Sequence, residues 1–414
     1  MNKNKTNNHS KFISHEHLDK IGEVALYYGF MPVKSPSVTK ADLDAAKDLL
    51  EGDYVDDETE SHNRFPLHAE EKIAFIRTYH EQNMHNQPQP VLLYFKDPCR
   101  SPLKKTSTQR YADLEIMGAS GAIAEATLIQ AARSMLAEEK YENTSVEINS
   151  IGDRDSIARF TRELTSYYRK HINDMTPECR QMLKHDPFEL LASHDAGAVE
   201  LNAHAPRGID FLSETSRRHL EEVLEYLEAL NVPYVINNGL MGNRKYCTET
   251  VFTIVNTDPS AKTAGKKSQH LLAVGVRYNG LAKRIGAKRD IQGVGISLLI
   301  KNNTAALRKP LAKTKRPITS FVQLGLESKL LSLAIIEHLR QAKIPLYLSL
   351  GKDRLGAQVS TVEKHHTPYV IVIGKKEAVE KNAIVRRTDT HAQDVVPLEH
   401  LAKHMKKIET QYWK

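Results

Sequence analysis

Cysteine is scarce in this 414-residue sequence, which contains only Cys99, Cys179 and Cys247 and no Cys-x-x-Cys pair. Such spacing argues against a disulfide framework and against a zinc cage, and it is typical of a protein kept in a reducing compartment. Nineteen histidines are present, but a pair such as His365–His366 has no third ligand nearby. No metal site is therefore expected.

Long apolar runs are also absent, and none approaches the ~20 residues that a membrane span requires. The first ten residues are polar and contain no apolar stretch, so they do not resemble a signal peptide. We therefore expect a cytoplasmic protein without membrane contact, with a disordered tail over residues 1–13.

Positive charge is unevenly distributed. From Asn303 onward there are 20 Lys and Arg against 10 Asp and Glu, a surplus of +10, whereas the rest of the chain carries 38 against 41, or −3. A basic module on a near-neutral body favours a polyanionic partner, of which nucleic acid is the commonest. The alternative is a solvated basic surface that serves only solubility.

Apolar periodicity predicts an α+β body over residues 14–302. Ser14 is expected to cap its first helix, which would end near Gly29, and a helical insertion is expected over about 153–230.

The C-terminal part has a different pattern. Residues 303–317 are polar, basic and contain proline, which indicates a linker. From 318 to 414 strands alternate with helices, including an expected strand at Leu346–Leu350, and this pattern favours a small α/β domain.

Two segments resemble a known family. Leu240–Phe252 reads Leu-Met-Gly-Asn-Arg-Lys-Tyr-Cys-Thr-Glu-Thr-Val-Phe, and Ala273–Leu281 reads Ala-Val-Gly-Val-Arg-Tyr-Asn-Gly-Leu. They resemble the signature segments of histidyl-tRNA synthetases, R-G-L-D-Y-Y-x-R-T-V-F-E and A-G-G-R-Y-D-G-L. Glu147–Gly152 and Pro368–Gly374 are similar to further segments of that family, in the same order.

The resemblance implies a class II aminoacyl-tRNA synthetase-like antiparallel-sheet core with a helical insertion, followed by a C-terminal anticodon-binding-like domain. It also implies a homodimer, because the strand within Phe30–Val38 looks like the class II motif that forms the dimer interface. tRNA would be the partner, and ATP and Mg would be cofactors only if the chain is catalytically active.

Several positions that would contact substrate differ from the family pattern. In motif 2 the phosphate-binding arginine falls on Asp97 and the glutamate on Cys99, whereas Arg100 retains the second arginine and is the one catalytic candidate. In motif 3 the glutamate falls on Lys301 and the adenine-stacking arginine on Asn302. Arginines at such positions neutralise charge that develops during activation, so their loss predicts a deficient site.

The amino-acid site is altered as well. The catalytic arginine of the first signature segment falls on Gly242, its aspartate on Lys245, and the threonine that helps hold the amino group of histidine falls on Lys72. Other positions are retained, either as a ligand pocket or as framework that the fold needs: Glu70, Glu115, Tyr246, Arg277 and Tyr278.

Three hypotheses follow. The first is a catalytically silent paralogue, a pseudoenzyme, that binds tRNA or another RNA. The second is a divergent but active histidine–tRNA ligase. The third is a histidine-sensing regulatory subunit of ATP phosphoribosyltransferase, which generally lacks the anticodon-binding domain expected here. Candidates for RNA contact are Lys104, Lys105, Arg110, Arg386 and Arg387.

Overall fold

The structure is a computed structural model, and it describes residues 11–16, 18–19, 21–50, 69–96, 110–193, 195–257, 270–300, 312–350 and 354–414. The chain divides into two compact units. The sheet unit contains residues 36–91 and 97–300, and the terminal unit contains residues 1–35, 92–96 and 301–414.

Six strands of the sheet unit are neighbours in the order β4-β9-β8-β7-β5-β6. β5 and β6 run parallel, and the other neighbours run antiparallel. The strands are β4 (Arg110–Met117), β5 (Thr144–Gly152), β6 (Tyr234–Ile236), β7 (Thr248–Asn256), β8 (His270–Arg277) and β9 (Gly293–Ile300). A mainly antiparallel sheet of this kind is the core that the sequence predicts for residues 14–302.

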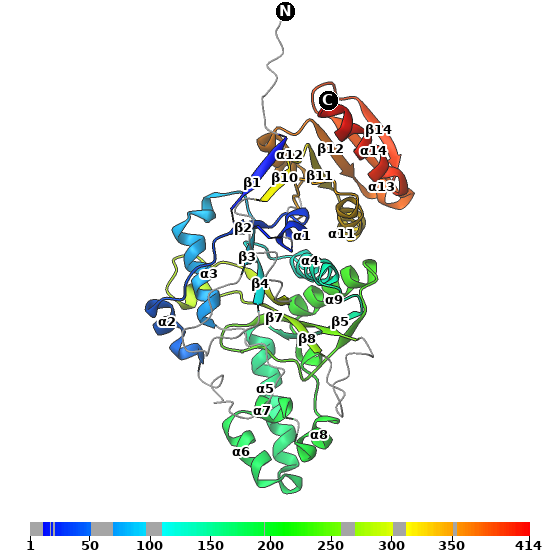
Figure 1. Cartoon of the computed structure of the whole chain (residues 1–414). Coiled ribbons are helices and arrows are strands. Elements are labelled where there is room, and N and C mark those ends of the chain that lie inside the picture. The colour runs from blue at the N-terminus through cyan, green and yellow to red at the C-terminus, as the bar shows by residue number, and fades with distance from the viewer. Residues whose placement is uncertain are drawn as a thin grey trace, which may run out of the picture. The chain divides into compact units, whose positions relative to one another are not determined.

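Helices α4 (Ile123–Glu138) and α9 (Glu214–Ala229) pack against each other and against this sheet (Figure 1). α4 is buried on most sides because apolar residues occupy most of its circumference. It nevertheless carries a fully buried carboxylate, Glu125. The sheet unit also contains α2 (Lys40–Leu50), α3 (Ala69–Glu81), the 3-10 turn η1 (Met84–Asn86) and α10 (Leu281–Arg284).

A helical subdomain follows β5. Its elements are α5 (Arg154–Lys170), η2 (Ile172–Asp174), α6 (Pro177–His185), α7 (Pro187–Ala192), α8 (Ala196–Asn202) and η3 (Gly208–Phe211). Residues such as Phe160, Leu164 and Tyr168 on one face of α5 form its apolar core. The Asp153 side chain caps α5 by accepting the Ser156 N–H, which satisfies one of the free donors at the helix start.

The terminal unit joins the two ends of the chain. It contains β1 (Phe12–His15), α1 (Gly22–Tyr27), β2 (Met31–Val33) and most of β3 (Val91–Lys96). β2 and β3 run parallel, and β1 pairs antiparallel with β10 (Ala312–Lys315). The Tyr28 hydroxyl donates to Glu337 at 2.5 Å, which attaches the residue after α1 to the C-terminal part of the unit.

That C-terminal part is a four-stranded sheet in the order β11-β12-β13-β14, with helices packed on it. β11 and β12 are parallel and the remaining neighbours antiparallel. Its elements are β11 (Thr319–Gln323), α11 (Leu326–Gln341), α12 (Leu355–His365), β12 (Tyr369–Ile373), α13 (Lys375–Glu380), β13 (Asn382–Arg387), β14 (Gln393–Pro397) and α14 (Leu398–Tyr412).

Some sequence expectations about the N-terminal segment were wrong. Ser14 lies in β1 and caps no helix, and α1 begins only at Gly22, whose N–H donates to Asp19 at 2.7 Å. β1 also starts at Phe12, inside the predicted tail 1–13. The cause is a long-range partner, because β10 lies more than 290 residues away in the sequence.

Two expectations in the C-terminal part also differ from the structure. β10 falls inside the predicted linker 303–317, since its pairing with β1 gives these basic residues a strand conformation. The strand expected at Leu346–Leu350 is reduced to a single bridge between Tyr347 and Ser320. In the parts of the chain that the structure describes, no helix is long and apolar enough to cross a membrane.

Candidate functional site

A buried cation lies at the centre of the retained positions. Lys72, in the first turn of α3, forms an ion pair with Glu115 of β4, and both side chains are almost completely buried. The other oxygen of Glu115 accepts a 2.5 Å hydrogen bond from the Tyr278 hydroxyl. The Lys72 ammonium also lies 5.4 Å from the Phe75 ring centre and 5.6 Å from that of Tyr278. We call these four residues the Lys72 cage.

The charges around the cage determine its protonation. Burial lowers the pKa of Lys72, but the negative charges of Glu115 and Asp113 outweigh it, so the pKa is raised overall. Burial, followed by the Glu115 charge, raises the pKa of Tyr278 well above its usual value. Lys72 is therefore charged and Tyr278 neutral at physiological pH.

Glycines make room for the cage. Glu115 of β4 lies opposite Gly295 of β9 in the sheet register, and a Cβ atom at 295 would overlap the Glu115 carboxylate. A Cβ atom at Gly293 would overlap the Tyr278 ring in the same way. Backbone without side chains at these positions therefore lets a carboxylate and an aromatic ring lie flat over β9.

Arg277 precedes Tyr278 but contacts a different carboxylate, because successive residues along a strand point to opposite faces. Its Nε and Nη2 donate to the two oxygens of Glu125, each at 2.6 Å, and Nη1 donates to the Ala119 carbonyl at 2.8 Å. His219 of α9 contacts Glu125 at 2.9 Å. Burial raises the pKa of Glu125, but Arg277 and His219 outweigh it and lower it to about 2. Glu125, Arg277 and His219 form the Glu125 network.

The remaining two pocket candidates, Glu70 and Tyr246, are both buried. Glu70 lies in the first turn of α3, two residues before Lys72, and is 1% exposed. Tyr246 is 3% exposed in the turn before β7, where its N–H donates to Asn243. The structure thus brings Glu115 and Tyr278 into direct contact, and it directs Arg277 to a separate network.

No side chain fits at Gly242 without movement. A Cβ atom there would lie 2.9 Å from the Cys247 Sγ, 3.0 Å from the Cys247 Cβ and 3.0 Å from a methyl group of Val251. The contact with Sγ is closer than real Cβ atoms show, and the other two are tighter than most Cβ contacts. A side chain at the position where the resemblance places a catalytic arginine would therefore have to displace Cys247 and Val251.

The two residues after Asn243 are used to hold this loop in place. Arg244 forms an ion pair with Asp186 and stacks on the Phe188 ring, with 3.8 Å between guanidinium and ring centre. Lys245, at the position of the family aspartate, donates to the Asp48 carbonyl at 3.0 Å. The carbonyl belongs to the last turn of α2, where a cation is favoured. Both side chains therefore stabilise packing within the sheet unit.

Many predicted positions lie outside the described residues. They are the motif 2 and motif 3 positions and two of the RNA-contact candidates: Asp97, Cys99, Arg100, Lys104, Lys105, Lys301 and Asn302. Arg110 starts β4 opposite Ile300. The roles expected for all of these residues stay predictions.

Arg386 and Arg387 end β13 and are both exposed. Arg387 forms a 2.7 Å ion pair with Asp389 and lies 6.0 Å from the Tyr369 ring centre. That pairing partly neutralises Arg387, so Arg386 offers the more available charge of the two.

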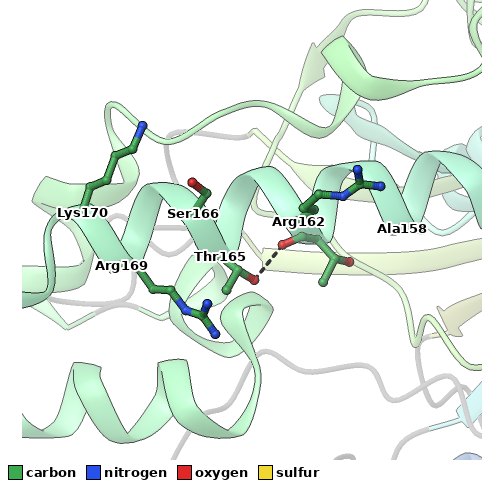
Figure 2. Close-up of a pocket in the computed structure, with 7 residues that line it drawn as sticks. Ala158, Arg162, Thr165, Ser166, Arg169 and Lys170 are labelled. Carbon is green, nitrogen blue, oxygen red and sulfur yellow. Dashed lines mark hydrogen bonds between the residues drawn. The ribbon is translucent and has the colours of Figure 1, made fainter.

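A shallow depression lies along one side of α5 (Figure 2). Its lining combines three cations with hydroxyl groups and one small residue: Ala158, Thr161, Arg162, Thr165, Ser166, Arg169 and Lys170. The Thr161 and Thr165 hydroxyls donate to carbonyls one turn earlier, the second of these bonds being drawn in Figure 2. Both hydroxyls therefore already form hydrogen bonds within the helix. The cations Arg162, Arg169 and Lys170 make this side of α5 basic.

Sequence reasoning missed the Glu125 network. Glu125 and His219 are 94 positions apart, and Glu125 and Arg277 are 152 apart, so no local motif joins them. A signal did exist: Glu125 is the only acidic residue among the buried residues of the mostly apolar helix α4. A carboxylate in such a place requires a buried cationic partner.

Comparisons with known proteins find similar chains among histidine–tRNA ligases. A family model described as "Anticodon binding domain" matches residues 327–408. The histidine–tRNA ligase of Symbiobacterium thermophilum is 25% identical over 406 residues, covering 94% of this chain and 92% of that protein. That of Fervidobacterium nodosum is 26% identical over 387 residues, covering 90% of each. The solved apo histidyl-tRNA synthetase of S. aureus covers 94% of both chains at 21% identity, with a TM-score of 0.49. Over nearly its whole length the chain is thus similar to histidine–tRNA ligases, and residues 327–408 match an anticodon-binding domain.

Proposed function

We propose that this chain is a histidyl-tRNA synthetase-like protein that binds tRNA or another RNA and does not activate an amino acid. The proposal includes a homodimer, as the resemblance of Phe30–Val38 to the interface strand of the family implies. ATP and Mg have no role in it.

The packing around Gly242 carries the proposal. Activation places negative charge on the ATP α-phosphate, and fixed cations that meet this charge supply much of the rate enhancement. The family uses an arginine at this position, whereas here Cys247 and Val251 occupy the space into which even a Cβ atom would project. Arg244 and Lys245, the nearest cations in the loop, are bound to Asp186 and to the Asp48 carbonyl.

RNA binding is supported by the C-terminal part of the chain. The match to an anticodon-binding domain covers residues 327–408, and the surplus of +10 lies in the same part of the sequence. Cations that neutralise phosphates release counterions, so such a surface binds RNA with a strong dependence on salt.

The activation test is histidine-dependent ATP–pyrophosphate exchange on the purified full-length protein. We expect no exchange above background, both for the natural chain and for Gly242→Arg, because the arginine would have to displace the side chains of Cys247 and Val251. Robust exchange by the natural chain would establish the second hypothesis, a divergent active ligase.

The RNA test measures binding of a tRNA transcript as a function of salt. Arg386→Gln should weaken binding and reduce the slope of log K against log salt by about 1, as expected for one lost phosphate contact. Arg387→Gln should have a smaller effect because of its pairing with Asp389. Lys184→Gln, on the exposed side of α6, is the matched control and should change neither quantity. No binding at low salt would reject RNA and favour a protein-docking role.

A further inference from the structure

The Lys72 cage has the composition of a binding site for a primary ammonium ion. An ammonium gains stability from a nearby carboxylate and from the negative faces of aromatic rings. Glu115 supplies the carboxylate, and the rings of Phe75 and Tyr278 lie 5.4 and 5.6 Å from the Lys72 nitrogen. All of these groups belong to the sheet unit.

The walls of the cage do not depend on Lys72. Glu115 and Tyr278 are joined directly by a 2.5 Å hydrogen bond and come from β4 and from the residue after β8. The Tyr278 N–H donates to the Gly293 carbonyl at 2.8 Å, which attaches it to β9. Two strands and the helix α3 thus surround a cation that reaches the cage through a flexible four-carbon chain.

The groups around the Lys72 ammonium favour a cation. Lys72 forms an ion pair with Glu115, and a second buried acidic residue, Asp113, lies two residues earlier on the same face of β4. Lys72 is 1% exposed, so its ammonium has exchanged water for these groups. A buried carboxylate left without a cation is costly, so the walls favour another cation when Lys72 is shortened.

We propose that Lys72 is a tethered occupant of an ammonium-binding cage, and that the cage binds a free primary alkylammonium when the lysine side chain is removed. One part of this inference rests on the proposed function: the Lys72 side chain excludes the amino group of an amino acid. That part follows because the resemblance places an amino-group-binding threonine at position 72. The cage itself rests only on the contacts given above.

The experiment is chemical rescue of Lys72→Ala by propylammonium chloride, whose carbon chain and ammonium replace the atoms that the substitution removes. Thermal unfolding of the full-length protein is followed as the salt is titrated at constant ionic strength. We expect a saturable rise in the midpoint temperature that recovers at least half of the loss caused by the substitution. Saturation follows from the logarithmic linkage between ligand concentration and stability.

Three controls define the result. 1-Propanol has the same carbon chain without the charge and should give no saturable rise. Lys72→Met fills the same space with a neutral chain and should not respond to propylammonium. Arg77→Ala removes a partly exposed cation from the same helix, paired with Asp42 and Glu81, and should not respond either.

A rise shared equally by all variants, or no rise in Lys72→Ala, overturns the cage. If Lys72→Ala does not fold alone, its refolding yield is measured with and without propylammonium. A yield that recovers only with propylammonium supports the cage, and a yield that does not recover overturns it. If the natural chain catalyses ATP–pyrophosphate exchange and propylammonium rescues Lys72→Ala, the proposed function is overturned and the cage stands. If there is neither exchange nor rescue, only the cage is overturned.

Discussion

Glu115 and Glu125 are both buried carboxylates of the sheet unit, and each is paired with a buried cation, yet the two pairs are built differently. Arg277 donates to both oxygens of Glu125 and to backbone carbonyls of Ala119 and Gly121. Lys72 is held by one oxygen of Glu115 and by aromatic faces. Arg277 is part of the structural framework, because it also donates hydrogen bonds to backbone carbonyls. The Lys72 ammonium contacts side chains, so we expect that a free ammonium ion can replace it.

This difference separates the roles of two positions, Arg277 and Tyr278, that look equivalent in the sequence. Arg277 and Tyr278 are adjacent residues of one signature segment, and both are retained pocket candidates. The strand turns Tyr278 toward the Lys72 cage and Arg277 toward the Glu125 network. Retention of Arg277 is thus accounted for by packing, independently of any substrate.

The largest expected effect comes from breaking the Glu125 network. Arg277→Met should lower the free energy of unfolding by about 3–5 kcal/mol, because it leaves a buried carboxylate without its main partner. Unfolding in urea measures the change. Arg218→Gln is the control, since Arg218 forms an exposed pair with Glu214 on α9, and such pairs contribute less than about 1 kcal/mol. Equal stabilities for the two variants would show that the network is not framework.

The second prediction uses pH to examine the same network. The pKa of Glu125 is about 2 in the folded protein, against 4.5 for an unperturbed glutamate. Because the folded value is the lower one, its stabilisation is complete above pH 4.5 and is lost as the pH falls toward 2. The difference amounts to about 3 kcal/mol at 1.36 kcal/mol per pKa unit.

Glu125→Gln removes this titration, so its unfolding free energy should depend less on pH between 4.5 and 2 than that of the natural chain. Urea unfolding at several pH values measures both curves. Parallel curves would mean that Glu125 titrates normally in the folded state.

The smallest expected effect is the sharpest test of the contrast. Lys72→Met and Glu115→Gln should each destabilise the protein, and the double variant should recover about 2 kcal/mol relative to their sum, because a neutral pair replaces a charged one. The double variant Arg277→Met with Glu125→Gln should be less stable than the Lys72→Met with Glu115→Gln double variant, since the carbonyl of Ala119 loses its donor. Urea unfolding of the two double variants measures this difference, and a double-mutant cycle for each pair measures the recovery. Equal stabilities of the two double variants would remove the distinction between framework and occupant.

The sequence was sufficient for elements that depend on local patterns. The helices α4, α9 and α11 and the strands of the main sheet follow from their apolar periodicity, and the side chain of Ser213 caps α9 by accepting the Ser216 N–H. α3 was not predicted, although it carries Lys72. β1 and β10 were missed because each becomes a strand only by pairing with the other across nearly 300 residues.

The site was predictable as a set of positions and not as a set of contacts. The resemblance identified Glu115, Tyr278 and the altered residue Lys72. It did not reveal that the three side chains meet, because α3, β4 and the end of β8 come together only in the folded sheet. Likewise, the absence of an arginine at 242 is visible in the sequence, whereas the space taken by Cys247 and Val251 is not.

The closed space at Gly242 has an evolutionary consequence. A Cβ atom there would lie 2.9 Å from the Cys247 Sγ and 3.0 Å from a methyl group of Val251, so an arginine gained by a single substitution would have to displace both side chains. Smaller residues at 247 or 251 would ease that substitution. The effect of an arginine at 242 therefore depends on which residues stand at two other positions, and such dependence is epistasis.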